Sequence, residues 1–196
     1  MSSARPKAKR RLHPIERADL AVARAAALDG RTTAARRIAA LAELGDQPPL
    51  RALCVLAIAA GIARRDPKMV RTGLRMLAAH SVATGIKSFI KHRIDRTRPG
   101  DAMSNARYRL DQGDSHQARL SSMPSGHSAG IAAVAMAVAR EYPSAAPVAG
   151  AAGASVILAQ LPSKNHYLSD VIIGTIIGVA AEVAVSALMS AAGKRD

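Results

Sequence analysis

Long apolar blocks separated by short polar segments dominate the last three quarters of this chain. The blocks cover residues 50–63, 69–90, 125–139, 144–161 and 171–193, and the last of them contains a single ionisable side chain, Glu182. Apolar runs of this kind form helices, and those approaching 20 residues are long enough to cross a bilayer. The pattern therefore predicts an all-α, membrane-embedded helical bundle of about five spanning or core helices.

The first quarter of the chain has a different pattern. Residues 14–28 and 33–44 mix Ala and Leu with spaced charges, which is typical of amphipathic helices that lie at an interface and are too polar to span a membrane. A Gly-Asp-Gln-Pro-Pro break follows at residues 45–49. We therefore divide the chain into a basic, disordered tail (1–12), amphipathic peripheral helices (13–47) and a helical membrane domain (48–196).

Composition and charge narrow the function classes. Aromatic residues make up 2% of the chain, so Ala, Val, Leu and Ile must form any interior, as in small-residue helices packed in lipid. The formal net charge of +14 implies a nucleic acid, anionic headgroups or a phosphorylated substrate as partner. A soluble, basic protein that binds nucleic acid is an alternative supported by charge alone. The single Cys54 excludes an internal disulfide and a Cys-based metal cluster.

The stretch SMPSGHSAG, residues 122–130, is the centre of the candidate chemistry. Ser125 is a good N-cap for the apolar block that follows, and Gly126 lets a ligand approach the backbone closely. The N–H groups at such a helix start favour an anion. His127 lies on the first turn, where it can exchange a proton with a group attached to that anion. The stretch predicts a phosphate site with a general acid; the alternative is an ordinary helix start with an interfacial histidine.

Two further stretches carry charged residues at helix boundaries. Lys91 and Arg98 are seven residues apart, so on a continuous helix they share a face just before Pro99 and form a clamp for phosphate oxygens. A basic cluster flanking a membrane helix is the alternative. His166 and Asp170 are four residues apart, so the carboxylate can accept a hydrogen bond from one imidazole nitrogen and leave the other as a nucleophile or base. A helix-capping pair is the alternative here.

In order, K-x6-R-P, P-S-G-H and H-x3-D resemble the motifs of the type 2 phosphatidic acid phosphatase superfamily, which also includes vanadium-dependent haloperoxidases. The resemblance covers roughly residue 48 to the C-terminus. It implies that His166 attacks phosphorus and forms a phosphohistidine, that Asp170 orients His166, and that His127 protonates the leaving oxygen. The groups it implies for holding the phosphoryl oxygens are Lys91, Arg98, Ser125 and Gly126. It implies no metal or other cofactor, because fixed cations and backbone dipoles stabilise the charge.

One position departs from the family pattern. In the superfamily a Ser-Arg pair precedes the third motif, and this chain has Ala159 and Gln160 there. The resemblance implies that this arginine holds the phosphate, so Gln160 is an atypical phosphate-binding candidate that supplies only neutral hydrogen bonds. Losing a charged donor can cost orders of magnitude in rate. Lys164 is close to Gln160 in the sequence, and Arg93 and Arg96 are the other cations that could replace the family arginine. The alternative function is a catalytically weakened relative that binds a phosphorylated lipid or a partner.

The resemblance and the apolar blocks together imply a hydrolase of a lipid phosphate or diphosphate monoester, integral to the cell membrane and multi-pass. Phosphatidic acid, phosphatidylglycerol phosphate and polyprenyl phosphates or diphosphates all fit. The expected partners are the lipid substrate and the membrane, with no nucleic acid. Gly174 and Gly178 suit either helix packing or a homodimer. Glu182 is expected to pair with a basic residue of a neighbouring helix or to line a substrate channel.

Overall fold

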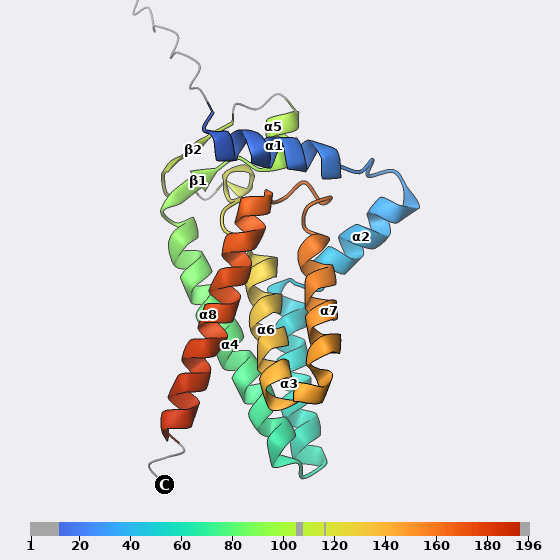
Figure 1. The fold of residues 1–196 in the computed structure, drawn as a ribbon, viewed down its shortest axis with the longest axis vertical. Coiled ribbons are helices and arrows are strands. Elements are labelled where there is room, and N and C mark those ends of the chain that lie inside the picture. Colours follow the sequence, from blue (N-terminus) through green and yellow to red (C-terminus); the bar gives the residue numbers. More distant parts are fainter. Residues whose placement is uncertain (1–11, 105–107, 116, 193–196) are drawn as a thin grey trace, which may run out of the picture.

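The computed structural model describes residues 12–104, 108–115 and 117–192, in which five helices form a bundle (Figure 1). They are α3 (Gln47–Ala63), α4 (Pro67–Lys91), α6 (Gly126–Glu141), α7 (Ala146–Leu158) and α8 (Leu168–Ala192). Helix α6 contacts the other four and is therefore the central helix. The prediction of an all-α bundle with about five core helices is confirmed. The predicted basic tail lies, except for Leu12, outside the described residues.

Side-chain caps set where the bundle helices begin. The Asp46 carboxylate accepts the N–H of Gln47 at the start of α3, and Asp66 caps α4 in the same way. Prolines occupy the first turn of both helices, where their missing N–H is not needed. Ser125 accepts the N–H of Ser128 and starts α6 where the sequence predicts it. A single 3-10 turn, η2 (Pro143–Ala145), joins α6 to α7.

The core is built from small side chains, as the composition predicts. Its main cluster contains five almost fully buried alanines, from α4, α6 and α8: Ala79, Ala83, Ala129, Ala133 and Ala181. A Cβ atom at Gly174 would collide with the carbonyl of Ser125, and one at Gly178 would meet the backbone of α6 in the same way. Both glycines therefore let α8 lie close against α6 within one chain. This helix packing explains why glycine occupies these two positions.

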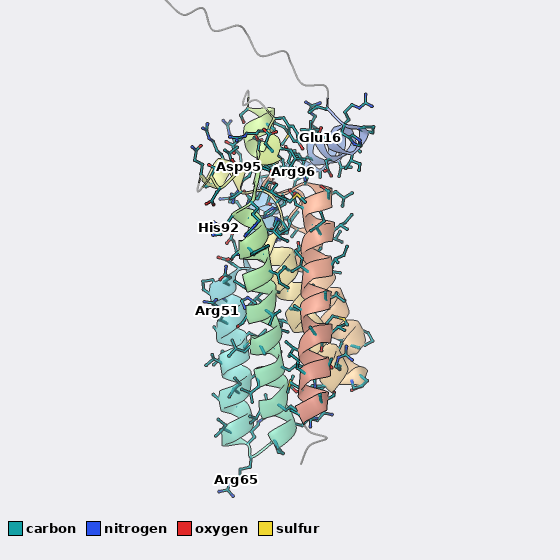
Figure 2. All side chains as sticks on the ribbon, turned by 90° about the vertical axis from the view of Figure 1, so that its left-hand side faces the viewer. Glu16, Arg51, Arg65, His92, Asp95 and Arg96 are labelled. Carbon is teal, nitrogen blue, oxygen red and sulfur yellow. The ribbon has the colours of Figure 1, made fainter. Side chains whose placement is uncertain are left out.

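The outer surface of the bundle is apolar. Large hydrophobic side chains are exposed on four bundle helices: Leu53, Val55, Leu56 and Ile62 of α3, Leu74, Val82, Ile86 and Phe89 of α4, Val148 and Leu158 of α7, and Ile172, Ile176, Val183 and Leu188 of α8. Within the described residues, α8 alone is long and apolar enough to cross a membrane, while α3 and the segment Pro143–Leu158 are apolar but shorter. His92, Asp95 and Arg96 lie at one end of the bundle and Arg65 at the other (Figure 2).

Two helices precede the bundle, as the sequence predicts. Helix α1 (Pro14–Ala26) lies across one end of the bundle, and α2 (Thr33–Glu43) leads down beside α7 (Figure 1). Asp19 of α1 is buried, and its carboxylate accepts hydrogen bonds from Arg96 and from the N–H of Ser169. These bonds fix α1 to the end of the bundle where α8 begins.

The segment between α4 and α6 folds over the same end of the bundle. It contains the strands β1 (Ile94–Arg96) and β2 (Leu110–Gln112), the short helix α5 (Pro99–Met103) and the 3-10 turn η1 (Ala118–Leu120). The two strands pair antiparallel. The expectation of one continuous helix through Lys91 and Arg98 is wrong, because α4 ends at Lys91 and β1 follows. The carboxylate of Asp95 holds the segment together by accepting the N–H of Ser115 and pairing with Arg109.

Candidate active site

His166 lies in the turn just before α8 and is 2% exposed. Its Nδ1 is 2.7 Å from the backbone carbonyl oxygen of Ser122. Because a carbonyl oxygen only accepts hydrogen bonds, this contact places the proton on Nδ1 and leaves the Nε2 lone pair free for chemistry. Burial lowers the pKa of His166 to about 3, and the charge of Lys91 contributes in the same direction. The imidazole is therefore neutral, as a nucleophile must be.

Asp170 supports His166 indirectly. Its carboxylate accepts hydrogen bonds from Arg96 Nη1 at 2.6 Å, from Ser122 Oγ at 2.6 Å and from the N–H of Tyr167 at 2.8 Å. The expectation of a direct bond to His166 is wrong. The two residues do not share a helix face, because α8 begins between them. Asp170 fixes Ser122, and the carbonyl of Ser122 fixes the imidazole.

Arg96 joins this network to the N-terminal helix. Its guanidinium is 2% exposed and lies between the carboxylates of Asp170 and Asp19, 2.6 and 2.7 Å away. It also donates to Ser169 Oγ and lies over the ring of Tyr167. Arg96 is one of the cations that could replace the family arginine. Its ion pairs assign it to holding the site together.

His127 lies on the first turn of α6, facing His166. The centroids of the two imidazole rings are 6.1 Å apart, at an interplanar angle of 61°. Glu43 and Asp46, at the two ends of the turn between α2 and α3, each bring a carboxylate oxygen within 4.8 Å of His127 and of each other. These carboxylates offset part of the cost of burying a charged imidazole. The three groups also have the donor types of a metal site, and Glu43 is exposed to solvent.

Lys91 and Arg98 converge although they do not share a helix. Lys91 Nζ donates to the backbone carbonyl of Ser121 at 2.9 Å, and Arg98 Nη2 lies 3.3 Å from Ser121 Oγ. Arg98 Nη1 lies 3.3 Å from Oδ1 of Asn165, the residue before His166. Among the described residues, the buried Nε of Arg98 has no hydrogen-bond partner. The two cations therefore approach His166 from two different elements, and the Nε–H of Arg98 stays available to a ligand.

Ser125 and Gly126 shape the loop that carries His127. The hydroxyl of Ser125 is fully buried and caps α6, while its N–H donates to the carbonyl of Asp170. Ser125 as a phosphate ligand stays a prediction. A Cβ atom at Gly126 would lie 3.1 Å from Cδ of Lys87, so the missing side chain makes room for this lysine.

Lys87 is a further cation beside the candidate site, and none of the three motifs contains it. It lies one helical turn before Lys91 on the same face of α4, and it is half-buried against Gly126. The four-residue spacing of two lysines at the end of an apolar helix was the available signal. Position alone could not separate it from an ordinary membrane-flanking cluster.

Gln160 does not lie in the phosphate site. Its side chain is 1% exposed, and its amide nitrogen donates to the carbonyls of Ala42 at 3.0 Å and Val156 at 3.2 Å. The expectation that Gln160 binds phosphate is therefore wrong. The amide instead links the end of α7 to the last turn of α2. Arg93, another cation that could replace the family arginine, donates to the carbonyl of Phe89 and stacks on the ring of Phe89 at 3.5 Å.

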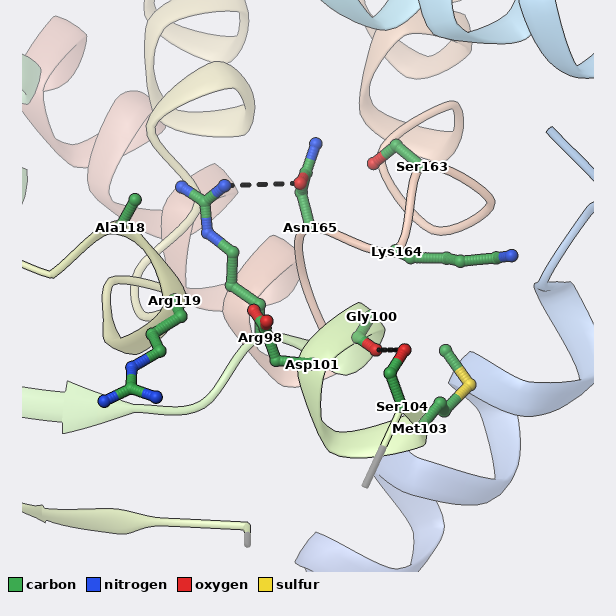
Figure 3. Close-up of a pocket in the computed structure, with 10 residues that line it drawn as sticks. All are labelled: Arg98, Gly100, Asp101, Met103, Ser104, Ala118, Arg119, Ser163, Lys164 and Asn165. Atoms are coloured by element: carbon green, nitrogen blue, oxygen red, sulfur yellow. Dashed lines mark hydrogen bonds between the residues drawn. The ribbon is translucent and has the colours of Figure 1, made fainter. Parts of the chain in front are cut away.

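A polar cavity of about 580 Å³ opens beside Arg98 (Figure 3). Arg98 and Asn165, joined by their hydrogen bond, form part of its wall, and Arg119, Lys164 and Asp101 contribute charge. Three cations against one carboxylate give this wall a net positive charge. Lys164, one of the cations that could replace the family arginine, lines this cavity. The cavity borders the site at Arg98 and at Asn165, the residue before His166.

The model of the PAP2 superfamily matches residues 72–194, and the chain belongs to this superfamily. The matched region contains the three motifs, so the resemblance seen in the sequence is confirmed. The fold is similar to the crystal structure of the first transmembrane PAP2 type phosphatidylglycerolphosphate phosphatase from Bacillus subtilis, with a TM-score of 0.62 and 18% identity over 91% of this chain and 88% of that one. A comparison with curated proteins gives no match.

Proposed function

We propose that this chain is a membrane-embedded phosphatase that hydrolyses a lipid phosphate or diphosphate monoester through a phosphohistidine at His166. The observation that carries the proposal is the hydrogen bond between His166 Nδ1 and the carbonyl of Ser122. It presents an uncharged Nε2 close to a second histidine and to several cations. A buried imidazole held in one tautomer is suited to nucleophilic attack.

The reaction proceeds in two displacements. His166 Nε2 attacks phosphorus, the bond from phosphorus to the lipid oxygen breaks, and His127 donates its proton to that oxygen. Water then attacks the phosphohistidine from the vacated side and gives its proton to His127, and phosphate leaves with the bond to Nε2 broken. The 6.1 Å between the imidazole centroids puts acid and nucleophile within reach of one phosphoryl group.

Three cations stabilise the charge on the phosphoryl oxygens. Lys91 and Arg98 meet at Ser121, and Lys87 lies against the Gly126 backbone. We assign to Lys87 the charge that the family arginine supplies, since Gln160 is neutral and its amide N–H groups are bonded to backbone carbonyls. Fixed cations at a developing charge are among the largest contributions to phosphoryl transfer.

The bundle surface supports a multi-pass location in the cell membrane. Its exposed leucines, isoleucines and valines form an apolar surface that is unfavourable in water and favourable in contact with acyl chains. Helix α8 is long enough to span, and α3 and α7 are of the shorter kind that needs polar or snorkelling flanks. The histidines lie at one end of the bundle, where a headgroup meets water. This arrangement favours a lipid substrate, for which phosphatidic acid, phosphatidylglycerol phosphate and polyprenyl diphosphate are the candidates.

A weakened relative that binds a phosphorylated lipid or a partner is the second candidate. The observation that favours it concerns Gln160: this neutral residue stands where the family has an arginine, and its amide nitrogen donates to the carbonyl of Ala42. If Lys87 does not compensate, the site retains an anion pocket with little transition-state stabilisation.

Phosphate release from the three candidate lipids by the detergent-purified chain tests the proposal. We expect release from at least one substrate, its loss in His166→Ala, and its retention in the matched control His92→Ala, whose side chain is exposed. Equal release by His166→Ala would overturn the phosphohistidine mechanism. A silent parent that becomes active in Gln160→Arg would instead support the weakened relative.

A further inference from the structure

A second cluster of cations lies at the end of the bundle opposite the histidines. Arg71 and Arg75 of α4 and Arg140 of α6 surround two carboxylates, Glu141 of α6 and Glu182 of α8. The expected partner of Glu182 on a neighbouring helix is thus Arg140, which binds both of its oxygens at 2.8 and 2.9 Å. The cluster belongs to none of the three sequence motifs.

Both carboxylates form ion pairs with these arginines. Glu141 accepts a hydrogen bond from Arg71 Nη2 at 2.7 Å and forms an ion pair with Arg75 Nε at 3.0 Å. Arg75 Nη1 donates to Ser186 Oγ at 2.9 Å. The side chains of Arg75, Glu141 and Glu182 are buried. Those of Arg71 and Arg140 are 55% and 40% exposed, so the cluster opens to solvent at these two guanidinium groups. Three guanidinium groups against two carboxylates leave one positive charge unbalanced, with N–H donors left over.

These groups line a cavity of about 480 Å³. Its wall consists of the guanidinium groups, two hydroxyl groups, one carboxylate and one thioether: Arg71, Arg75, Arg140, Ser186, Ser190, Glu141 and Met189. Guanidinium groups that project from two helices, α4 and α6, suit an oxyanion, which accepts several charged hydrogen bonds at once. The volume is ample for a phosphate-sized group with part of its ester.

We propose that this cavity binds the phosphodiester headgroup of an anionic phospholipid. The single unbalanced charge matches a monoanion, whereas the cation-rich site near the histidines suits a monoester of higher charge. Exposed Leu74 and Leu188, the sequence neighbours of Arg75 and Met189, offer apolar surface for acyl chains beside the headgroup. The inference rests on the proposed membrane location but not on the proposed chemistry.

Thermal unfolding of the detergent-purified full chain, titrated with phosphatidylglycerol, phosphatidylcholine or the soluble headgroup glycerophosphoglycerol, tests the inference. Phosphatidylglycerol is expected to raise the unfolding midpoint, phosphatidylcholine to leave it unchanged, and the soluble headgroup to act only at much higher concentration. A response to the soluble headgroup equal to that of the lipid would overturn the lipid assignment. Binding at the active site is separated by Arg98→Gln, in which the lipid response is expected to persist.

Two variants locate the binding. Arg71→Gln, at a side chain 55% exposed, removes the unbalanced charge while Arg75 still serves Glu141, and it is expected to weaken the apparent affinity for phosphatidylglycerol by roughly tenfold or more. Ser190→Glu places a negative charge at the exposed rim and is expected to act in the same direction without disturbing the ion pairs. Arg64→Gln, an exposed change of equal charge just after α3, is the control. Parental affinity in both Arg71→Gln and Ser190→Glu would show that the cluster only joins helices.

Discussion

His166 donates its Nδ1–H to the backbone carbonyl of Ser122 across 2.7 Å. A main-chain carbonyl carries no titratable proton, so this partner holds the same tautomer over the whole pH range in which the chain is folded. The carboxylate of Asp170 contacts Ser122 Oγ at 2.6 Å and reaches the imidazole only through that residue. The nucleophile is therefore oriented by the loop that also carries the acid, and both histidines move together if the loop moves.

Ser122→Ala should separate the contribution of Asp170 from that of the carbonyl. The change removes the hydroxyl bonded to Asp170 but keeps the carbonyl bonded to His166. We expect kcat to fall about tenfold with little change in KM, and the free energy of unfolding to fall by about 1–3 kcal/mol because a buried acceptor loses its donor. Steady-state kinetics and thermal unfolding measure the two effects. Ser104→Ala, at an exposed hydroxyl, is the control, and parental kcat in Ser122→Ala would mean that Asp170 does not act through Ser122.

The bundle was predictable because its signals are local. Apolar runs, prolines and capping Asp or Ser residues mark each helix, and these decide helix ends wherever no distant partner competes. The strands β1 and β2 gave no such signal, since a three-residue ladder depends on a partner more than ten positions away in the chain. The same limit made Lys91 and Arg98 look like neighbours on one helix.

The candidate site was predictable in its residue types but not in its bonds. The motifs point to His127, His166, Lys91 and Arg98, which the fold brings together from four separate elements. Tertiary packing decides which atoms form hydrogen bonds. The bond from His166 to the Ser122 carbonyl could therefore not be predicted from the spacing of His166 and Asp170. Lys87 and Gln160 were misjudged for the same reason.

Gln160→Ala is expected to damage stability more than chemistry. The buried Ala42 carbonyl loses its donor and the side chain leaves a void, which together cost about 2–4 kcal/mol. Because the amide is not in the phosphate site, kcat/KM of the folded variant should stay within about threefold of the parent. Unfolding curves and initial rates at a temperature where both proteins are folded provide the measurement. A large loss of kcat/KM with unchanged stability would restore Gln160 to the phosphate site.

Lys87→Gln should weaken the binding of phosphate. Charged hydrogen bonds contribute about 1.5–3 kcal/mol, so the inhibition constant for inorganic phosphate is expected to rise by roughly tenfold or more. Lys68→Gln, at the far end of the same helix, makes the same change of charge and should leave inhibition unaltered. If both variants respond equally to phosphate, Lys87 contributes only to the general field of the protein, and the missing family arginine has no local replacement.

Burial of His166 makes the stability of the chain depend on pH. The pKa of this imidazole is lowered from 6.5 to about 3 in the folded chain, chiefly by burial. Between these two values the unfolded chain binds a proton that the folded chain does not, so the free energy of unfolding falls as the pH falls below 6.5. From this group alone the loss is about 2 kcal/mol between pH 8 and pH 5, and it is complete near pH 3.

Comparison with His166→Gln isolates this contribution, because the other titrating groups cancel in the difference. Between pH 8 and pH 5 the unfolding midpoint of the parent should fall by about 4–8 °C more than that of the variant, as expected for about 2 kcal/mol in a chain of this size. His92→Gln, at an exposed imidazole, should follow the parent. Parallel curves for parent and His166→Gln would mean that the folded chain protonates His166 at an ordinary pKa. The imidazole would then be charged in mild acid, and phosphatase activity would need a base to free it before attack.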